Sequence, residues 1–121
     1  MNELKTFLIR REGKVIMEGC TLPDNQCAVN WVNSELPAHG CYPNFELLTK
    51  LQQRMGNRDI IFAPFLKDGA FYESRFNLIR NEDVGGLTGT GIIAVGCEFS
   101  DGLIVLQHTT ETATTFWYTQ D

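Results

Sequence analysis

Apolar and polar positions alternate along most of this chain, in short runs rich in Val, Ile, Leu, Phe and Thr. Side chains of this kind favour a pleated, half-buried surface, so the runs predict β-strands. The turns between them carry hairpin residues, for example Asp24-Asn25 and Asp101-Gly102. The predicted strands cover residues 5–12, 14–22, 26–33, 59–65, 71–82, 90–99, 103–110 and 113–119.

One stretch has helical spacing instead. Phe45, Leu48, Leu51 and Met55 recur at intervals of three and four residues. Asn44 ahead of them is a good N-cap, and the glycine behind them is a common helix end. The pattern predicts a single helix at about residues 44–56.

The two ends of the chain resemble each other. GKVIMEGCTLPDNQCAVNWV (13–32) aligns with TGIIAVGCEFSDGLIVLQHT (90–109), and LIRRE (8–12) aligns with LIRNE (78–82). The second copy then has seven extra residues, 83–89. We interpret this as an internal duplication; the alternative is that any two β-hairpins look alike.

These observations predict one domain, residues 1–121, of the α+β class and mainly β. It would contain two duplicated antiparallel β-meander units, 5–33 and 76–110, with the helix inserted between them. No apolar run is long enough to span a membrane, and the first residues do not resemble a signal peptide. We expect a protein that stays in the cytoplasm.

The four cysteines show no C-x-x-C spacing, and the acidic residues are scattered, so we expect neither a disulfide framework nor a metal or cofactor site. The two histidines, His39 and His108, are not part of any recognisable catalytic motif. We therefore predict a binding protein rather than an enzyme.

Charge is distributed unevenly along the chain. The formal net charge is −5, which argues against general nucleic-acid binding. All ten Lys and Arg residues lie at or before Arg80, and residues 81–121 contain six acidic residues and no base. Any phosphate-binding cations must therefore come from the first two thirds of the chain.

The most unusual segment is DVGGLTGTG (83–91). A strand is predicted after it, whereas the P-loop and dinucleotide fingerprints require a helix there. A flexible turn or bulge is one reading, and a ligand-facing loop is the other. Aromatic and basic side chains on the preceding strand suit a nucleobase and its phosphate, although they could equally be one core face with solvated charges.

A second aromatic group lies near the end of the chain. Phe116, Trp117 and Tyr118 are consecutive, so a strand there places bulk on both of its faces. One face can belong to the core, and the other would be an exposed patch suited to a homo-oligomer contact. For ligand binding we predict seven residues, the last contributed by a neighbouring chain: Arg75, Phe76, Arg80, Thr88, Gly89, Thr90 and Trp117.

Residues 76–102, FNLIRNEDVGGLTGTGIIAVGCEFSDG, resemble a short β-module of phage and prophage small proteins. In that module an Arg-x-x-Asp-Val segment leads to a Gly-rich turn, then to a strand, an aromatic residue and Asp-Gly. The arrangement resembles viral anti-defence sponges, in particular the Thoeris anti-defence family, which sequesters cyclic ADP-ribose isomers.

The resemblance implies a homo-oligomeric phage protein in the cytoplasm of a bacterial host. It would bind a nucleotide-derived immune signal, either a cyclic ADP-ribose isomer or a cyclic oligonucleotide, without cleaving it. The alternative is an acidic inhibitor whose C-terminal third binds a host defence protein directly.

Overall fold

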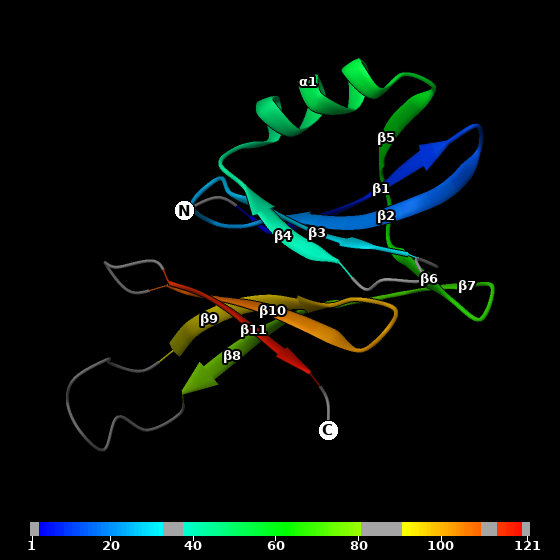
Figure 1. The fold of residues 1–121 in the computed structure, drawn as a ribbon. Coiled ribbons are helices and arrows are strands. Elements are labelled where there is room, and N and C mark those ends of the chain that lie inside the picture. The colour runs from blue at the N-terminus through cyan, green and yellow to red at the C-terminus, as the bar shows by residue number, and fades with distance from the viewer. Residues whose placement is uncertain (1–2, 33–37, 81–90, 110–113, 120–121) are drawn as a thin grey trace.

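The protein is built in three layers, a helix and two β-sheets, as the computed structural model in Figure 1 shows. The structure describes residues 3–32, 38–80, 91–109 and 114–119. The helix α1 covers one side of the first sheet, and the second sheet packs against the other side. The expectation of a mainly β chain with one predicted helix is confirmed.

The first sheet has five antiparallel strands in the order β4-β3-β2-β1-β5. Its strands run β1 Lys5–Arg11, β2 Lys14–Thr21, β3 Cys27–Trp31, β4 His39–Tyr42 and β5 Arg58–Phe62.

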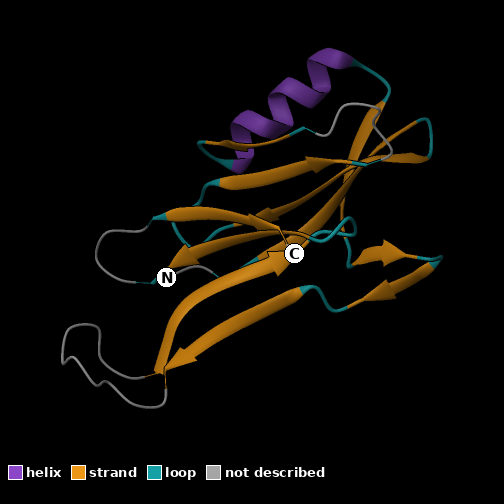
Figure 2. Cartoon of the chain, turned by 60° about the horizontal axis from the view of Figure 1, so that its bottom comes forward, coloured by secondary structure: helices purple, strands orange, loops and turns teal. Residues whose placement is uncertain are grey.

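The second sheet has four antiparallel strands in the order β11-β10-β9-β8, which lie toward the viewer in Figure 2. A two-stranded hairpin, β6-β7, connects the sheets. These elements run β6 Phe65–Lys67, β7 Ala70–Tyr72, β8 Arg75–Arg80, β9 Gly91–Glu98, β10 Leu103–His108 and β11 Thr115–Thr119.

The helix α1, Phe45–Met55, begins and ends where the sequence predicts. The Asn44 side chain accepts a hydrogen bond from the Leu47 N–H, and Gly56 ends the helix with a positive φ of 74°. Glu46 in the first turn and Arg54 in the last complement the helix dipole. Leu48 is fully buried against the first sheet.

Two predicted strands are divided in the structure. Residues 59–65 contribute to both β5 and β6, because Pro64, which has no N–H to donate, separates the two strands. Residues 71–82 contain β7 and β8, which pair in different sheets. The strand β4 was not predicted, because HGCY lacks the β-branched residues that the prediction relied on.

The two sheets pair their strands in matching registers. Phe7 of β1 lies opposite Gly19 of β2, and Phe76 of β8 lies opposite Gly96 of β9. The third strand of each sheet also pairs with this glycine: Val29 of β3 lies opposite Gly19, and Leu106 of β10 lies opposite Gly96. Both first strands also carry an irregularity two residues beyond the phenylalanine. These are the registers that a duplication would produce, while the duplication itself remains a prediction.

The sequence alignment of the first strands is displaced by one residue. LIRRE and LIRNE place Leu8 on Leu78, whereas the strand registers place Leu8 on Asn77 and Arg11 on Arg80. A one-residue slip moves every side chain to the opposite face of a sheet. In the structure, the equivalent positions of the two first strands are therefore those set by the phenylalanine–glycine pairs and not those of the LIRRE–LIRNE alignment.

The main core lies between the two sheets. Cys20 and Cys97 occupy equivalent positions and are both fully buried there. A hydrogen bond with Cys97, together with burial, raises the pKa of the Cys20 thiol well above its usual value. Both cysteines are free in the structure.

Polar links cross between the sheets in reciprocal pairs. The Asn30 side chain donates to Asp101 Oδ2 at 3.0 Å, and the Asp24 N–H donates to Gln107 Oε1 at 3.1 Å. Each link joins the tight turn of one sheet to the third strand of the other. Because Asn30 and Gln107 are buried, these bonds satisfy polar groups that would otherwise be costly to bury.

Candidate functional site

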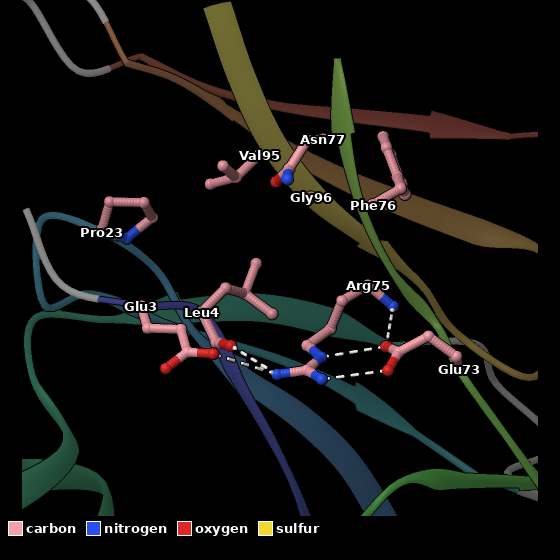
Figure 3. A pocket seen from close by; sticks show the side chains of 9 residues that line it. All are labelled: Glu3, Leu4, Pro23, Glu73, Arg75, Phe76, Asn77, Val95 and Gly96. Carbon is pink, nitrogen blue, oxygen red and sulfur yellow. Dashed lines mark hydrogen bonds and ion pairs between the residues drawn. The ribbon is translucent and has the colours of Figure 1, made fainter. Parts of the chain in front are cut away.

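A surface pocket of about 460 Å³ lies beside two of the predicted binding residues, Arg75 and Phe76. Figure 3 shows it between the start of the chain and the strands β8 and β9. Its lining residues are Glu3, Leu4, Pro23, Glu73, Arg75, Phe76, Asn77, Val95 and Gly96.

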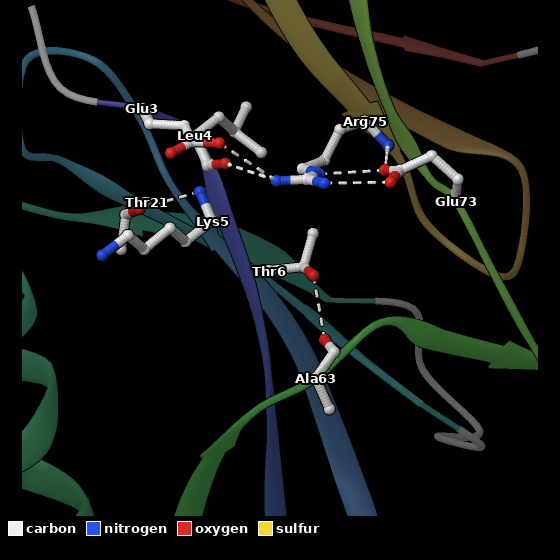
Figure 4. Close-up of polar contacts among 8 residues, drawn as sticks. All are labelled: Glu3, Leu4, Lys5, Thr6, Thr21, Ala63, Glu73 and Arg75. Atoms are coloured by element: carbon white, nitrogen blue, oxygen red, sulfur yellow. Dashed lines mark hydrogen bonds and ion pairs between the residues drawn. The ribbon is translucent and has the colours of Figure 1, made fainter.

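The charge of Arg75 is already compensated within the chain. Its Nε and Nη2 donate to the two carboxylate oxygens of Glu73 at 2.9 and 3.0 Å (Figure 4). Its Nη1 lies 3.5 Å from Glu3 Oε1 and donates to the Leu4 carbonyl at 3.4 Å. The hydrogen bonds from Arg75 lower the pKa of Glu73 to about 2. The pocket lining therefore holds two carboxylates and one cation, which disfavours a phosphate.

The other predicted binding residues are not brought into this pocket. Arg80 ends β8, and its side chain is not described. Thr88, Gly89 and Thr90 lie outside the described residues. Trp117 is half-buried between the sheets, with its ring stacked on Phe99 and next to His39.

A different group of cations meets on the outer face of the first sheet. Arg11 of β1 lies directly opposite Lys14 on β2 and directly opposite Arg58 on β5. We call Arg58, Arg11 and Lys14 the cationic row. Residues that lie opposite each other in an antiparallel pair point to the same face, so the three side chains share one side of the sheet.

An aromatic side chain lies beside the cationic row. The Arg58 guanidinium lies over the Trp31 ring, 5.6 Å from its centroid, and Nη1 donates to Gln52 Oε1 of α1 at 2.8 Å. The Arg58 Nε is buried and has no hydrogen-bond partner among the described residues. Trp31 itself is 37% exposed. The arrangement offers a charged and aromatic surface just past the C-terminal end of α1.

Within the described part of the chain, no member of the cationic row forms an ion pair with an acidic side chain. The neighbouring Arg10 differs, because its guanidinium is paired with Asp59. Like charges directly opposite one another destabilise a sheet. The row therefore has an electrostatic cost that a bound anion would relieve.

Arg11, Lys14 and Arg58 are among the basic residues of the first two thirds of the chain, from which the sequence predicts that any phosphate-binding cations must come, but nothing in the sequence groups these three. They come from three strands, and only the sheet register brings them together. Arg80, which the sequence did single out, is the register equivalent of Arg11 in the second sheet.

A buried carboxyl elsewhere has a structural explanation. Glu18 on β2 accepts hydrogen bonds from the N–H and the hydroxyl of Ser100, at 3.0 and 2.9 Å. Burial raises the pKa of Glu18, and the two bonds from Ser100 oppose that shift. No histidine or cysteine bonds to this carboxyl among the described contacts, so we interpret Glu18 as a link between the sheets.

Among the residues that the structure describes, no group of three or more His, Cys, Asp or Glu side chains could hold a metal ion. No helix of the described chain is long and apolar enough to cross a membrane.

Comparison with known proteins adds one finding. Residues 73–121 match the model of a family described as Acb5 phage protein. The match supports a phage anti-defence protein. It spans the whole of the second sheet, from the residue pair before β8 to the end of the chain, and includes Arg80 but not the cationic row. No curated protein and no solved structure matches the chain.

Proposed function

We propose that this phage protein counters a bacterial defence system by binding a nucleotide-derived immune signal without cleaving it. The signal would be a cyclic ADP-ribose isomer or a cyclic oligonucleotide, both of which carry phosphates and nucleobases. Sequestration in the host cytoplasm would deny the signal to its effector. The family match to the second sheet supports the anti-defence role. The chemical class of the ligand is inferred from the site described next.

The observation that carries this proposal is the cationic row beside Trp31. Arg and Lys side chains bind phosphate oxygens, and an indole ring stacks with a nucleobase. Arg58 already lies over Trp31, so the charge and the ring are held together before any ligand binds. The row also lacks carboxylate partners, unlike Arg75, whose guanidinium is held by Glu73 and Glu3.

The second sheet supplies a related position. Arg80 corresponds to Arg11 in the strand registers. It lies three residues before the glycine-rich segment 83–91, for which a ligand-facing loop is one of the two readings of the sequence. A ligand site at Arg80 would lie within the residues that match the phage family. The proposal therefore includes Arg80 as a further cation, at the equivalent end of the second sheet.

Isothermal titration calorimetry tests the proposal. The probes are cyclic dinucleotides, cyclic trinucleotides and cyclic ADP-ribose isomers, with chromatography of the probe afterwards to establish that it is intact. We expect the wild-type protein to bind one of these classes of probe. The variant Arg11→Ser/Lys14→Ser should bind the same probe at least about tenfold more weakly, because a hydrogen bond to a charged group contributes about 1.5–3 kcal/mol.

The matched control is Lys5→Ser/Lys67→Ser, which removes the same charge from two exposed lysines outside the row. It should bind like the wild type. Failure of the wild-type protein to bind any of the probes would contradict the proposal and favour direct binding to a host defence protein. Conversion of the probe to a product would contradict the claim that the protein does not cleave it.

A further inference from the structure

A smaller pocket lies between the helix α1 and the strand β5, which follows the helix directly in the chain (Figure 1). We call it the helix–strand pocket. It lies on the same face of the first sheet as the cationic row, because Arg58, Ile60 and Phe62 alternate along β5 and all line it. Its volume of about 260 Å³ is below the roughly 300–1,000 Å³ of pockets that hold a drug-sized ligand. It therefore suits one ring system rather than a whole nucleotide signal.

Two aromatic rings form part of the pocket wall. Phe45 begins α1 and Phe62 ends β5, and their ring centroids lie 5.2 Å apart with 36° between the ring planes. Phe62 is 58% exposed, although the edge of its ring also contacts the buried Phe7. An exposed aromatic ring on the wall of a pocket offers a stacking surface to a flat ligand.

Hydrogen-bonding groups lie beside these rings. Gln52 and Gln53 of α1 both line the pocket, and a glutamine amide carries donors as well as an acceptor. Gln52 is buried, whereas Gln53 is exposed. The strand β5 is at the edge of its sheet, so its free side adds backbone N–H and C=O groups. Stacking on an aromatic side chain together with hydrogen bonds to the ring edge is how protein pockets bind a nucleobase.

Arg58 belongs both to this pocket and to the cationic row. Its guanidinium lies over Trp31, and its Nη1 donates to Gln52. Its Nε is buried and has no hydrogen-bond partner among the described residues. A buried donor without a partner destabilises a protein. An acceptor atom on a ligand in the pocket would relieve that cost, so Arg58 is a second indication that this pocket receives a ligand.

The pocket and Trp31 are separate aromatic sites on one face. Ile60, which lines the pocket, lies in one line across the sheet with Ile9, Met17 and Trp31. The line crosses β5, β1, β2 and β3, so its ends are three strand spacings, or about 14 Å, apart. The cationic row lies two residues farther along β5, at Arg58. The face thus offers two positions for a ring, with cations alongside them.

We propose that the helix–strand pocket is a base-binding subsite, and that the ligand of the cationic row is a cyclic oligonucleotide. This inference rests on the proposed function and narrows its ligand class. A cyclic dinucleotide or trinucleotide has one base for Trp31, another for the pocket beside Phe62, and phosphates that join the two nucleosides. A cyclic ADP-ribose isomer has a single adenine, so it can fill only one of the two positions.

Titration calorimetry of the full chain tests this inference, with cyclic di-AMP, cyclic di-GMP, cyclic tri-AMP and a cyclic ADP-ribose isomer as probes. The wild type should bind one of the cyclic oligonucleotides at least about fivefold more tightly than the cyclic ADP-ribose isomer, because each stacked base adds at least that factor. Phe62→Thr removes the exposed ring and keeps a strand-forming side chain. It should weaken binding of that oligonucleotide by at least about fivefold.

A second variant, Gln53→Ala, changes an exposed helical position where alanine favours the fold, and it should also weaken binding of the same oligonucleotide. The matched control is Phe71→Thr, which removes a ring that is 62% exposed and lies outside the pocket. It should bind like the wild type, and circular dichroism should give all three variants the wild-type spectrum.

The possible failures of the two proposals can be told apart. Tightest binding of the cyclic ADP-ribose isomer overturns the base-binding subsite and leaves sequestration intact. Wild-type affinity of both Phe62→Thr and Gln53→Ala for the oligonucleotide does the same. A wild-type protein that binds none of the probes overturns the proposed function, and the subsite with it.

Discussion

The ring of Phe76 lies over Gly96, so that a Cβ on that glycine would come within 2.9 Å of the ring's Cζ. It would also come within 2.5 Å of the Val105 carbonyl oxygen, a backbone atom that cannot easily move. We therefore expect Gly96→Ala to lower the free energy of unfolding by about 1–3 kcal/mol, the usual cost of overpacking. Urea denaturation monitored by tryptophan fluorescence measures this.

Gly40 provides the control for that substitution, because a Cβ there meets no atom within 4 Å. Gly40→Ala should leave the stability close to that of the wild type. If the two alanine variants were equally stable, the close packing of Phe76 on Gly96 would not be the reason for glycine at position 96.

Glu18 makes stability depend on pH in an unusual direction. Because burial raises its pKa in the folded state, the folded protein holds this proton more tightly than the unfolded chain does. Stability from this group is fully present below the ordinary pKa of 4.5 and is lost as pH rises toward the raised value. Glu18→Gln keeps an oxygen acceptor for Ser100 and cannot ionise.

We expect the stability difference between Glu18→Gln and the wild type to move in favour of the variant as pH rises from about 4.5. Urea denaturation of both proteins at a series of pH values gives this difference directly. A difference that stays constant with pH would mean that Glu18 titrates alike in the folded and unfolded chains.

The cross-sheet link from Asn30 to Asp101 should contribute measurably to stability. Asn30 is buried, and its partner is a carboxylate, so we expect Asn30→Ala to cost about 1–3 kcal/mol. Lys50→Ala breaks an exposed ion pair with Glu46 and should cost no more than about 0.5 kcal/mol. Thermal or urea denaturation of the two variants compares the losses, and equal losses would contradict the role of the link.

The arginines of β8 should differ in their effect on ligand binding. Arg80→Ala should weaken binding by about 1.5–3 kcal/mol, as expected for a lost hydrogen bond to a charged group. Arg75→Ala should have the smaller effect, because Glu73 and Glu3 already occupy the guanidinium. Calorimetry with the ligand that the wild type binds measures the loss of affinity in each variant. Unchanged affinity of Arg80→Ala for that ligand would show that Arg80 is not part of the site.

Local chemistry made some of this fold predictable. The cap Asn44, the helical spacing after it and the terminal Gly56 define α1 within a residue or two, because capping depends only on neighbouring residues. The alternation that places Trp117 inward and Phe116 outward is likewise a local property of a strand.

Other features depend on long-range pairing, which the sequence did not reveal. The match of LIRRE to LIRNE suggested a register that the phenylalanine–glycine pairs contradict by one residue. The cationic row joins residues from three strands, and the contact of Arg58 with Trp31 crosses the sheet. The ion pairs that occupy Arg75 also include Glu3 from the start of the chain, far away in sequence.

Native mass spectrometry tests the central claim most directly. The protein would be purified from bacteria that produce cyclic nucleotide and cyclic ADP-ribose signals, and its mass compared with that of the same protein from cells that produce none. The account predicts an added small molecule that carries phosphate and is released intact on heating. Protein of identical mass from both sources, or release of only a cleaved product, would contradict sequestration.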